Sequence, residues 1–316
     1  MKYRNHNGAP GSLTKKGYSN PTTFIKNVSR LSAPSNDSQN GTRLGDNLEL
    51  VQQIRNSVTI KTGEFEALTR IFTGQKMYVD TRDISLAPHL MLDGVWEEPL
   101  TKLLLNQLHT DSVLLDVGAN FGYFGLIAAT KIRTGSIHFF EPNPTLAHYI
   151  RKTISINGLG SRGRINEIAI GSESGNLVLH VPREFFGSGS VRSIRYEDDS
   201  LERLNGSDTF NVKQSSIDSY VAAEKIQKVD FIKIDIEGFE DQAYQGMLKT
   251  IGDNPGITVF LEFTPSGYKD PKKFFEQLMN DFPNRKAITK TGESINLSSY
   301  EELISLVDGY AMLYLH

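Results

Sequence analysis

The chain has 316 residues, with 34 Lys and Arg against 37 Asp and Glu for a formal net charge of −3, and it contains no cysteine. A hydrophobic fraction of 38% and a charged fraction of 22% are typical of a globular protein and exclude a disordered or fibrous chain. The absence of cysteine excludes disulfide bonds, thiolate metal sites and a cysteine nucleophile.

Residues 1–45 are predicted to form a flexible basic tail. They contain seven basic residues and one acidic residue, so they carry +6 while the rest of the chain carries −9. They lack an apolar run that could offset the entropy cost of ordering, and they lack the apolar region of a secretory signal. No stretch approaches the roughly 20 apolar residues of a membrane span. We therefore expect a soluble, cytoplasmic protein whose tail is a solvated terminus and not a nucleic-acid tether.

Residues 46–110 are predicted to form an N-terminal cap of short helices and strands. Apolar residues spaced by three and four indicate a helix over 48–54. Short strands are predicted at 76–79 and 84–86, and a helix is predicted over 99–108, with a proline in its first turn.

Strands and helices alternate over residues 111–316. This alternation predicts a Rossmann-like, doubly wound α/β core with a mostly parallel sheet and an antiparallel last strand. An insertion over 171–216, with a flexible loop at 187–190, is predicted to be a substrate lid. The predicted strands lie at 113–117, 136–140, 164–170, 229–234, 257–261 and 310–315, and the predicted helices at 123–131, 144–157 and 300–307.

A turn with two glycines, Gly118 and Gly122, follows the first of these strands and opens a helix. A dinucleotide-binding turn would carry three glycines around a pyrophosphate. Asn120 stands where the middle glycine would be. The pattern therefore disfavours NAD and a dehydrogenase.

Acidic residues follow the first two strands. Asp116 needs a partner, such as a ligand ammonium, because burying an unpaired carboxylate is costly. Glu141 ends the second strand, where nucleoside-binding α/β folds place an acid that accepts hydrogen bonds from ribose hydroxyls. No Lys or Arg lies nearby to neutralise a phosphate. These residues favour a cationic, phosphate-free nucleoside, of which S-adenosylmethionine (SAM) is the common one.

Charged residues also alternate along the predicted central strand. Lys233, Asp235 and Glu237 would lie on one side if the strand continues that far. A central parallel strand is normally apolar, so the charges form either a structural ion network or part of a site at the carboxyl end of the strand.

Over about residues 93–263 the chain resembles class I SAM-dependent methyltransferases, and within these the FkbM family. The resemblance implies a seven-stranded fold and methyl transfer, typically to a hydroxyl oxygen of a small molecule or sugar. The stretches that carry it are 115–122 (LDVGANFG), 140–144 (FEPNP) and 230–240 (DFIKIDIEGFE), with 94–97 (GVWE), 216–218 (SID) and 261–263 (LEF) around them.

The resemblance also implies which residues contact the cofactor. Asp116, Gly118 and Asn120 would line the methionine end of SAM, Glu141 would hold the ribose, and Ala169 would lie near the adenine. The remaining predicted cofactor contacts are Ala119, Phe121, Pro142, Asn143 and Glu97.

Methyl transfer from a sulfonium requires alignment of acceptor, methyl and sulfur, and a hydroxyl acceptor must lose its proton. Asp235 is the first choice for a base or positioning group near the methyl. Lys233 would tune Asp235 or, if desolvation lowers its pKa, act as the base. Glu237 is the third predicted catalytic residue.

Glu262, Ser188 and Trp96 are predicted to contact the acceptor. Asp235, Glu237 and Glu262 could instead hold a Mg²⁺ ion, but we do not favour this, and no metal ligand set is predicted. The sequence also leaves open an RNA methyltransferase guided by the basic tail, or a binding module without catalytic activity. It indicates no oligomeric state.

Overall fold

The computed structural model describes residues 58–191, 206–289, 291–306 and 309–316. The basic tail predicted over 1–45 and the helix predicted over 48–54 lie outside the described residues.

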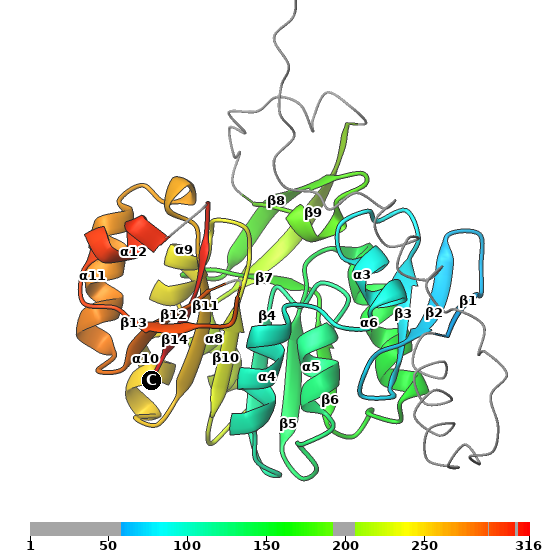
Figure 1. The fold of residues 1–316 in the computed structure, drawn as a ribbon, viewed down its shortest axis with the longest axis horizontal. Coiled ribbons are helices and arrows are strands. Elements are labelled where there is room, and N and C mark those ends of the chain that lie inside the picture. The colour runs from blue at the N-terminus through cyan, green and yellow to red at the C-terminus, as the bar shows by residue number, and fades with distance from the viewer. Residues whose placement is uncertain (1–57, 192–205, 290, 307–308) are drawn as a thin grey trace, which may run out of the picture. The chain divides into compact units, whose positions relative to one another are not determined.

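The central sheet has eight strands in the order β13-β12-β14-β11-β10-β4-β5-β6 (Figure 1). The strands from β11 to β6 are parallel, and β14 runs antiparallel between β11 and β12. The doubly wound α/β fold and its antiparallel last strand are thus confirmed, although β13 adds an eighth strand to the expected seven. The bounds are β4 (Val113–Val117), β5 (Ser136–Phe140), β6 (Gly163–Asn166), β10 (Phe231–Ile234), β11 (Thr258–Phe263), β12 (Arg285–Ile288), β13 (Ser294–Asn296) and β14 (Ala311–Leu315).

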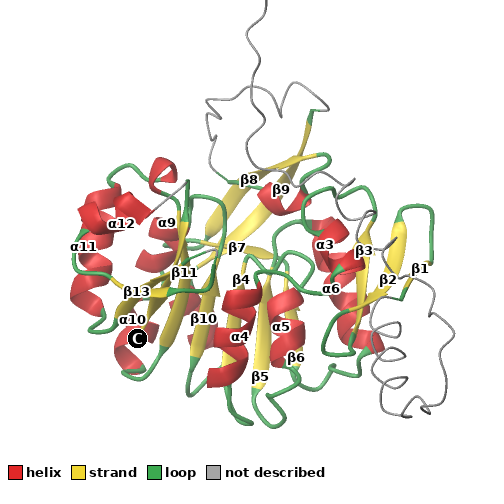
Figure 2. Cartoon of the chain, viewed as in Figure 1, coloured by secondary structure: helices red, strands yellow, loops and turns green. Residues whose placement is uncertain are grey.

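Helices cover both faces of this sheet, with α4 and α5 side by side on one of them (Figure 2). Buried apolar residues form two clusters, one that includes α3 to α6 and another that includes α8, α9, α11 and α12. Burial on both faces explains why the strands read as nearly continuous apolar runs. The helices are α3 (Ala87–Leu92), α4 (Glu98–Gln107), α5 (Tyr123–Ala128), α6 (Pro144–Ile156), α8 (Ile217–Ala223), α9 (Glu240–Gln245), α10 (Leu248–Asp253), α11 (Pro271–Asp281) and α12 (Tyr300–Leu306).

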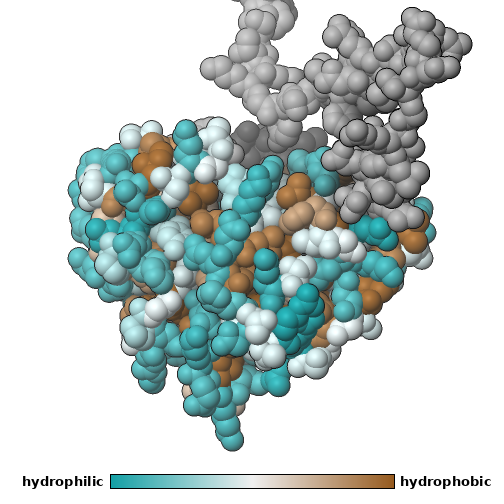
Figure 3. Space-filling model, turned by 60° about the horizontal axis from the view of Figure 1, so that its bottom comes forward, coloured by the Kyte–Doolittle hydropathy of each residue, from teal (hydrophilic) through white to brown (hydrophobic). Residues whose placement is uncertain are grey.

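The face drawn in Figure 3 is largely hydrophilic, with hydrophobic residues in small groups between the polar ones. Within the described ranges, no helix combines the length and the apolar character that crossing a membrane requires.

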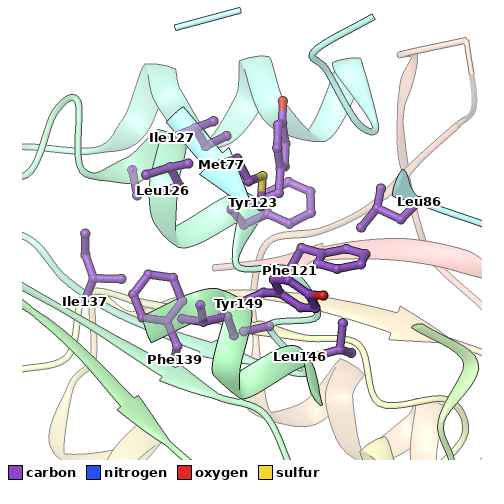
Figure 4. Packing of buried hydrophobic residues seen from close by; sticks show 14 of the residues in the cluster. Met77, Leu86, Phe121, Tyr123, Leu126, Ile127, Ile137, Phe139, Leu146 and Tyr149 are labelled. Carbon is purple, nitrogen blue, oxygen red and sulfur yellow. The ribbon is translucent and has the colours of Figure 1, made fainter. Parts of the chain in front are cut away.

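Aromatic and aliphatic side chains pack together in the first cluster, which includes Phe121 of the glycine turn (Figure 4). Phe121 is fully buried, and its ring lies 6.0 Å from that of Tyr149 on α6. The Phe121 side chain packs in the core and holds the turn in place, so the predicted contact of Phe121 with the cofactor stays a prediction for its backbone.

A separate antiparallel sheet, made of β1 (Thr59–Lys61), β2 (Glu66–Arg70) and β3 (Lys76–Asp80), precedes the core. It is fastened to α6, because the N–H of Tyr78 donates to Thr153 Oγ1 at 3.1 Å and the Tyr149 hydroxyl donates to Asp80 at 3.1 Å.

The strand predicted at 84–86 is wrong, because this segment is a turn that leads into α3. The buried carboxylate of Asp83 accepts hydrogen bonds from the N–H groups of Leu86 and Ala87, both at 2.8 Å. These bonds satisfy the free N–H groups at the start of the helix and so fix where it begins.

Strand β7 (Ile168–Ile170) forms a third sheet with two strands of the insertion, β9 (Ser207–Ser215) and β8 (Gly175–Pro182), while residues 192–205 of the insertion lie outside the described residues. The single strand predicted at 164–170 is divided, since β6 ends the central sheet and β7 pairs with β9. Of the flexible loop predicted at 187–190, the first two residues belong to a short 3₁₀ helix, η1 (Phe186–Ser188), and Ser190 forms an isolated β-bridge with His180.

Candidate functional site

The glycine turn depends on three residues with positive φ, namely Gly118 at 74°, Asn120 at 53° and Gly122 at 84°. Asparagine tolerates this left-handed conformation better than most residues, which explains why it can occupy the middle position. A Cβ added to Gly118 would lie 1.8 Å from the backbone carbonyl oxygen of Asp235. The turn therefore packs directly against the loop that follows β10.

The first N–H groups of this turn are already occupied. Those of Gly118 and Ala119 donate to the carbonyl of Phe140 at 3.0 and 3.1 Å, and that of Asn120 donates to Glu141 Oε2 at 2.8 Å. A pyrophosphate-binding turn instead points free N–H groups at its anion. The geometry agrees with a ligand that has no phosphate.

Glu141 lies buried at the end of β5. Its Oε1 accepts a hydrogen bond from the N–H of Asn143 at 2.8 Å, while Oε2 is held by Asn120. Burial raises the pKa of Glu141 to about 7, although both backbone hydrogen bonds oppose the shift. A carboxylate oxygen has two lone pairs, so each oxygen can still accept a hydroxyl proton. Pro142 is half-buried next to it.

Asp116 is fully buried on β4. Its Oδ2 accepts a hydrogen bond from the N–H of Gly125 at 3.0 Å, and its Oδ1 has no partner among the described residues. Burial raises its pKa, while the charge of Lys233, its register partner on β10, lowers it. The sequence predicted that a ligand ammonium would balance the charge of Asp116, and Lys233 supplies part of that positive charge.

Lys233 is 4% exposed, and its Nζ lies 2.9 Å from Asp235 Oδ2. Burial alone would lower the pKa of Lys233, but the charges of Asp235, Asp116 and Glu97 raise it well above the usual value. The expectation that a lowered pKa could make Lys233 the base is therefore wrong. The lysine acts as a fixed positive charge that holds Asp235.

Strand β10 ends at Ile234, so Asp235 and Glu237 lie in the loop beyond it and the two-residue alternation stops there. Glu237 has a positive φ of 57°. Burial, with the charges of Asp235 and Glu240, raises the pKa of Glu237 to about 8.

Glu240 shapes this loop and was not among the predicted site residues. Its Oε1 accepts hydrogen bonds from the N–H groups of Ile236 at 2.9 Å and Gly238 at 3.1 Å. Its Oε2 accepts one from the Tyr268 hydroxyl at 2.9 Å. Glu240 is the last residue of the EGFE stretch, so the family motif could have identified it. No sequence motif surrounds Tyr268.

Glu97 and Glu262 approach the same loop from other elements. Glu97 precedes α4, and its Oε2 is buried without a hydrogen-bond partner in the part of the chain that the structure describes. Burial and the charge of Asp235 raise its pKa to about 7. Burial, with the charges of Asp235 and Glu237, raises the pKa of Glu262 on β11 well above its usual value.

The insertion also reaches the site. A Cβ on Gly187 would lie 2.5 Å from Asn120 Nδ2, and the Ser190 hydroxyl donates to the carbonyl of Glu237 at 3.0 Å. Ser188, which was predicted to contact the acceptor, is half-buried in η1 between them. Ala169 is buried on β7, opposite Gln214.

A cavity of about 910 Å³ opens beside Glu97. It brings Trp96 and Glu97, from the start of α4, together with Tyr310 and Met312 near the C-terminus and Thr289 after β12. Burial and the charges of Glu97 and its acidic neighbours raise the pKa of Tyr310 to about 12. Tyr310 has no sequence motif that could have identified it.

Within the described ranges, no three His, Asp or Glu side chains are grouped so that they could hold a metal ion.

Two curated proteins and several solved structures are similar to this chain. It is 26% identical over 157 residues to the hexuronic acid methyltransferase AglP of Haloferax volcanii, covering 49% of this chain and 58% of the relative. It is 24% identical over 173 residues to the 2-O-methyltransferase NoeI of Sinorhizobium fredii, covering 53% and 65%. The chain thus spans less than two thirds of either relative.

Among solved structures, an O-methyltransferase from Bacillus cereus is 15% identical with a TM-score of 0.39, covering 93% of this chain and 97% of the other. A precorrin-6y C5,15-methyltransferase from Geobacter metallireducens is 13% identical with a TM-score of 0.36, covering 69% and 87%. These scores are low, so the fold assignment rests on the strand order.

A family model described as the methyltransferase FkbM domain matches residues 116–288, which is more than half of the chain. The match begins at the buried Asp116 and runs through Glu141, the Lys233–Asp235 pair and the end of β12. The chain belongs to the FkbM methyltransferase family.

Proposed function

We propose that the protein is a SAM-dependent methyltransferase that transfers a methyl group to a hydroxyl of a small molecule or sugar. The observation that carries the proposal is a pair of buried oxygens without hydrogen-bond partners among the described residues, namely Asp116 Oδ1 and Asn120 Oδ1. Buried polar atoms are normally paired, so these oxygens suit a ligand rich in N–H and O–H donors.

The residues present fit SAM in charge as well as in hydrogen bonding. When bound, SAM supplies an electrophilic methyl group on a positively charged sulfur. Lys233 is the only buried Lys or Arg in the described ranges and is outnumbered by the acids around the site, so a cationic ligand fits there. We assign Asp116 and Asn120 to the amino-acid end, and Glu141, with its remaining lone pairs, to the ribose hydroxyls.

Ala119, Pro142, Asn143 and Ala169 complete the proposed cofactor site. Asp235, held by Lys233, places a negative charge beside the reacting methyl and aligns the acceptor with it. Glu237 and Glu262 orient the acceptor from the neighbouring elements. Trp96 and Ser188 contact it from the cavity wall and from the insertion, whose described parts, 171–191 and 206–216, act as a lid.

The names of the two similar curated proteins support an oxygen acceptor on a small molecule or sugar. The names of AglP and NoeI describe a hexuronic acid methyltransferase and a 2-O-methyltransferase. The first name fits a sugar acid as acceptor, and the second fits methyl transfer to an oxygen.

Replacing Glu141 by alanine is expected to weaken SAM binding about 10- to 100-fold, because the ribose loses a charge-assisted acceptor and two backbone N–H groups lose their partner. Isothermal titration of both proteins with SAM measures the change. Glu224→Ala, which removes an exposed acid paired with Arg164, is the control and should bind like the wild type. An unchanged affinity in Glu141→Ala, or no binding by the wild type, would contradict the proposed cofactor site.

A further inference from the structure

Glu97 has an unusual backbone conformation. Its φ of 40° is left-handed, which costs about 1–3 kcal/mol for a residue other than glycine. The start of α4 fixes this conformation, since the carbonyl of Glu97 accepts a hydrogen bond from the N–H of Thr101 at 2.9 Å. Residues held in such conformations concentrate at functional sites.

Glu97 lines the cavity of about 910 Å³. Its Oε2 is buried and without a hydrogen-bond partner within the described ranges, so its lone pairs are unused by the protein. Trp96 and Tyr310 line the same cavity. Aromatic side chains of this kind suit a ring-shaped acceptor that has a flat apolar face and hydroxyl groups at its edge.

Charged and titratable groups face Glu97 from every element packed around it. They are Lys233 on β10, Asp235 in the loop after it, Glu262 on β11, Tyr123 on α5 and Tyr310 before β14. Asp235 is already engaged by Lys233 at 2.9 Å, whereas Glu97 keeps an unshared oxygen. Burial and the charge of Asp235 raise the pKa of Glu97 to about 7, which is the range in which a carboxylate is an efficient base near neutral pH.

We propose that this cavity is the acceptor site and that Glu97 is the catalytic base that takes the proton of the acceptor hydroxyl. The inference rests on the proposed methyltransferase function and corrects the predicted role of Glu97 as a cofactor contact. The acceptor oxygen forms its bond to the methyl carbon as its O–H bond breaks. The proton goes to Glu97 Oε2, and the electron pair of the broken sulfur–methyl bond stays on sulfur.

The first test needs no acceptor. Trp96 is the only tryptophan of the chain, so protein emission reports on the cavity beside Glu97. The His89 ring lies 5.2 Å from Trp96, so His89→Gln, which removes this neighbouring imidazole, is the reference protein. Its emission should change with pH around 7, and the change should be absent after Glu97→Gln is added. An identical titration in both proteins would overturn the assignment.

The second test separates a base from a cofactor contact. Wild type, Glu97→Gln and Glu224→Gln are incubated with methyl-labelled SAM and the small-molecule extract of the source cells. Glu97→Gln should form labelled product at least about 100-fold more slowly while its SAM affinity by titration stays unchanged. Glu224→Gln should match the wild type in both.

Weakened SAM binding in Glu97→Gln, with an unchanged rate at saturating SAM, would overturn the base assignment and restore the cofactor role. A wild type that binds no SAM would instead overturn the proposed function.

Discussion

Gly118→Ala is expected to abolish SAM binding and to lower the free energy of unfolding by about 2–5 kcal/mol. At a φ of 74°, the new methyl would lie 1.8 Å from the carbonyl oxygen of Asp235. That oxygen belongs to backbone and cannot rotate away, so the glycine turn and the loop after β10 must separate. Urea denaturation measures the stability, and isothermal titration measures the binding.

Gly158→Ala is the matched control for this substitution. Gly158 also has a positive φ, 64°, but a Cβ there meets nothing within 4 Å. Gly158→Ala should lower the free energy of unfolding only through conformational strain, by about 1–2 kcal/mol, and it should leave SAM binding intact. If the two variants lose the same stability and both bind SAM, the close approach of Gly118 to Asp235 does not shape the site.

Asp235→Asn is expected to slow methyl transfer at least about 100-fold while SAM still binds, because the site loses the preorganised charge beside the reacting methyl. The substitution also removes the ion-pair partner of buried Lys233. Asp116 remains as a neighbouring acid, so we expect a loss of about 1–3 kcal/mol in the free energy of unfolding. Initial rates at saturating SAM and urea denaturation measure the two effects.

Asp253→Asn controls for the loss of an ion pair as such. Asp253 pairs with Lys249 one helical turn earlier, and both side chains are largely exposed. Such surface pairs contribute little, so rate and stability should stay close to the wild type. If Asp235→Asn transfers methyl groups at the wild-type rate with SAM bound, Asp235 has no role in the methyl-transfer step.

The parallel core could be predicted because each strand is a short apolar run bounded by a turn. The division of 164–170 into β6 and β7 could not, since one apolar stretch serves two sheets and only tertiary pairing decides where it breaks. Helix α11 was not among the predicted elements, although Asp270 and Pro271 carry a helix-start signal and Asp270 caps it.

The acids Asp116, Glu141 and Asp235 could be placed together from the sequence, because carboxyl ends of parallel strands meet at one edge of the sheet. The protonation of Lys233 could not be predicted, because it depends on charges that Asp116 and Glu97 bring from other elements. Tyr310 and Ser190 reach the site through the C-terminal strand and the insertion, and neither lies in a recognisable motif.

Incubating the wild-type chain with methyl-labelled SAM and fractionated cellular metabolites, followed by mass spectrometry of the labelled product, tests the central claim most directly. The proposed function predicts a small molecule or sugar that gains one methyl group on a hydroxyl oxygen, in a reaction that Asp235→Asn nearly abolishes. Label in RNA, label on carbon or nitrogen, or no transfer by a protein that binds SAM would contradict it.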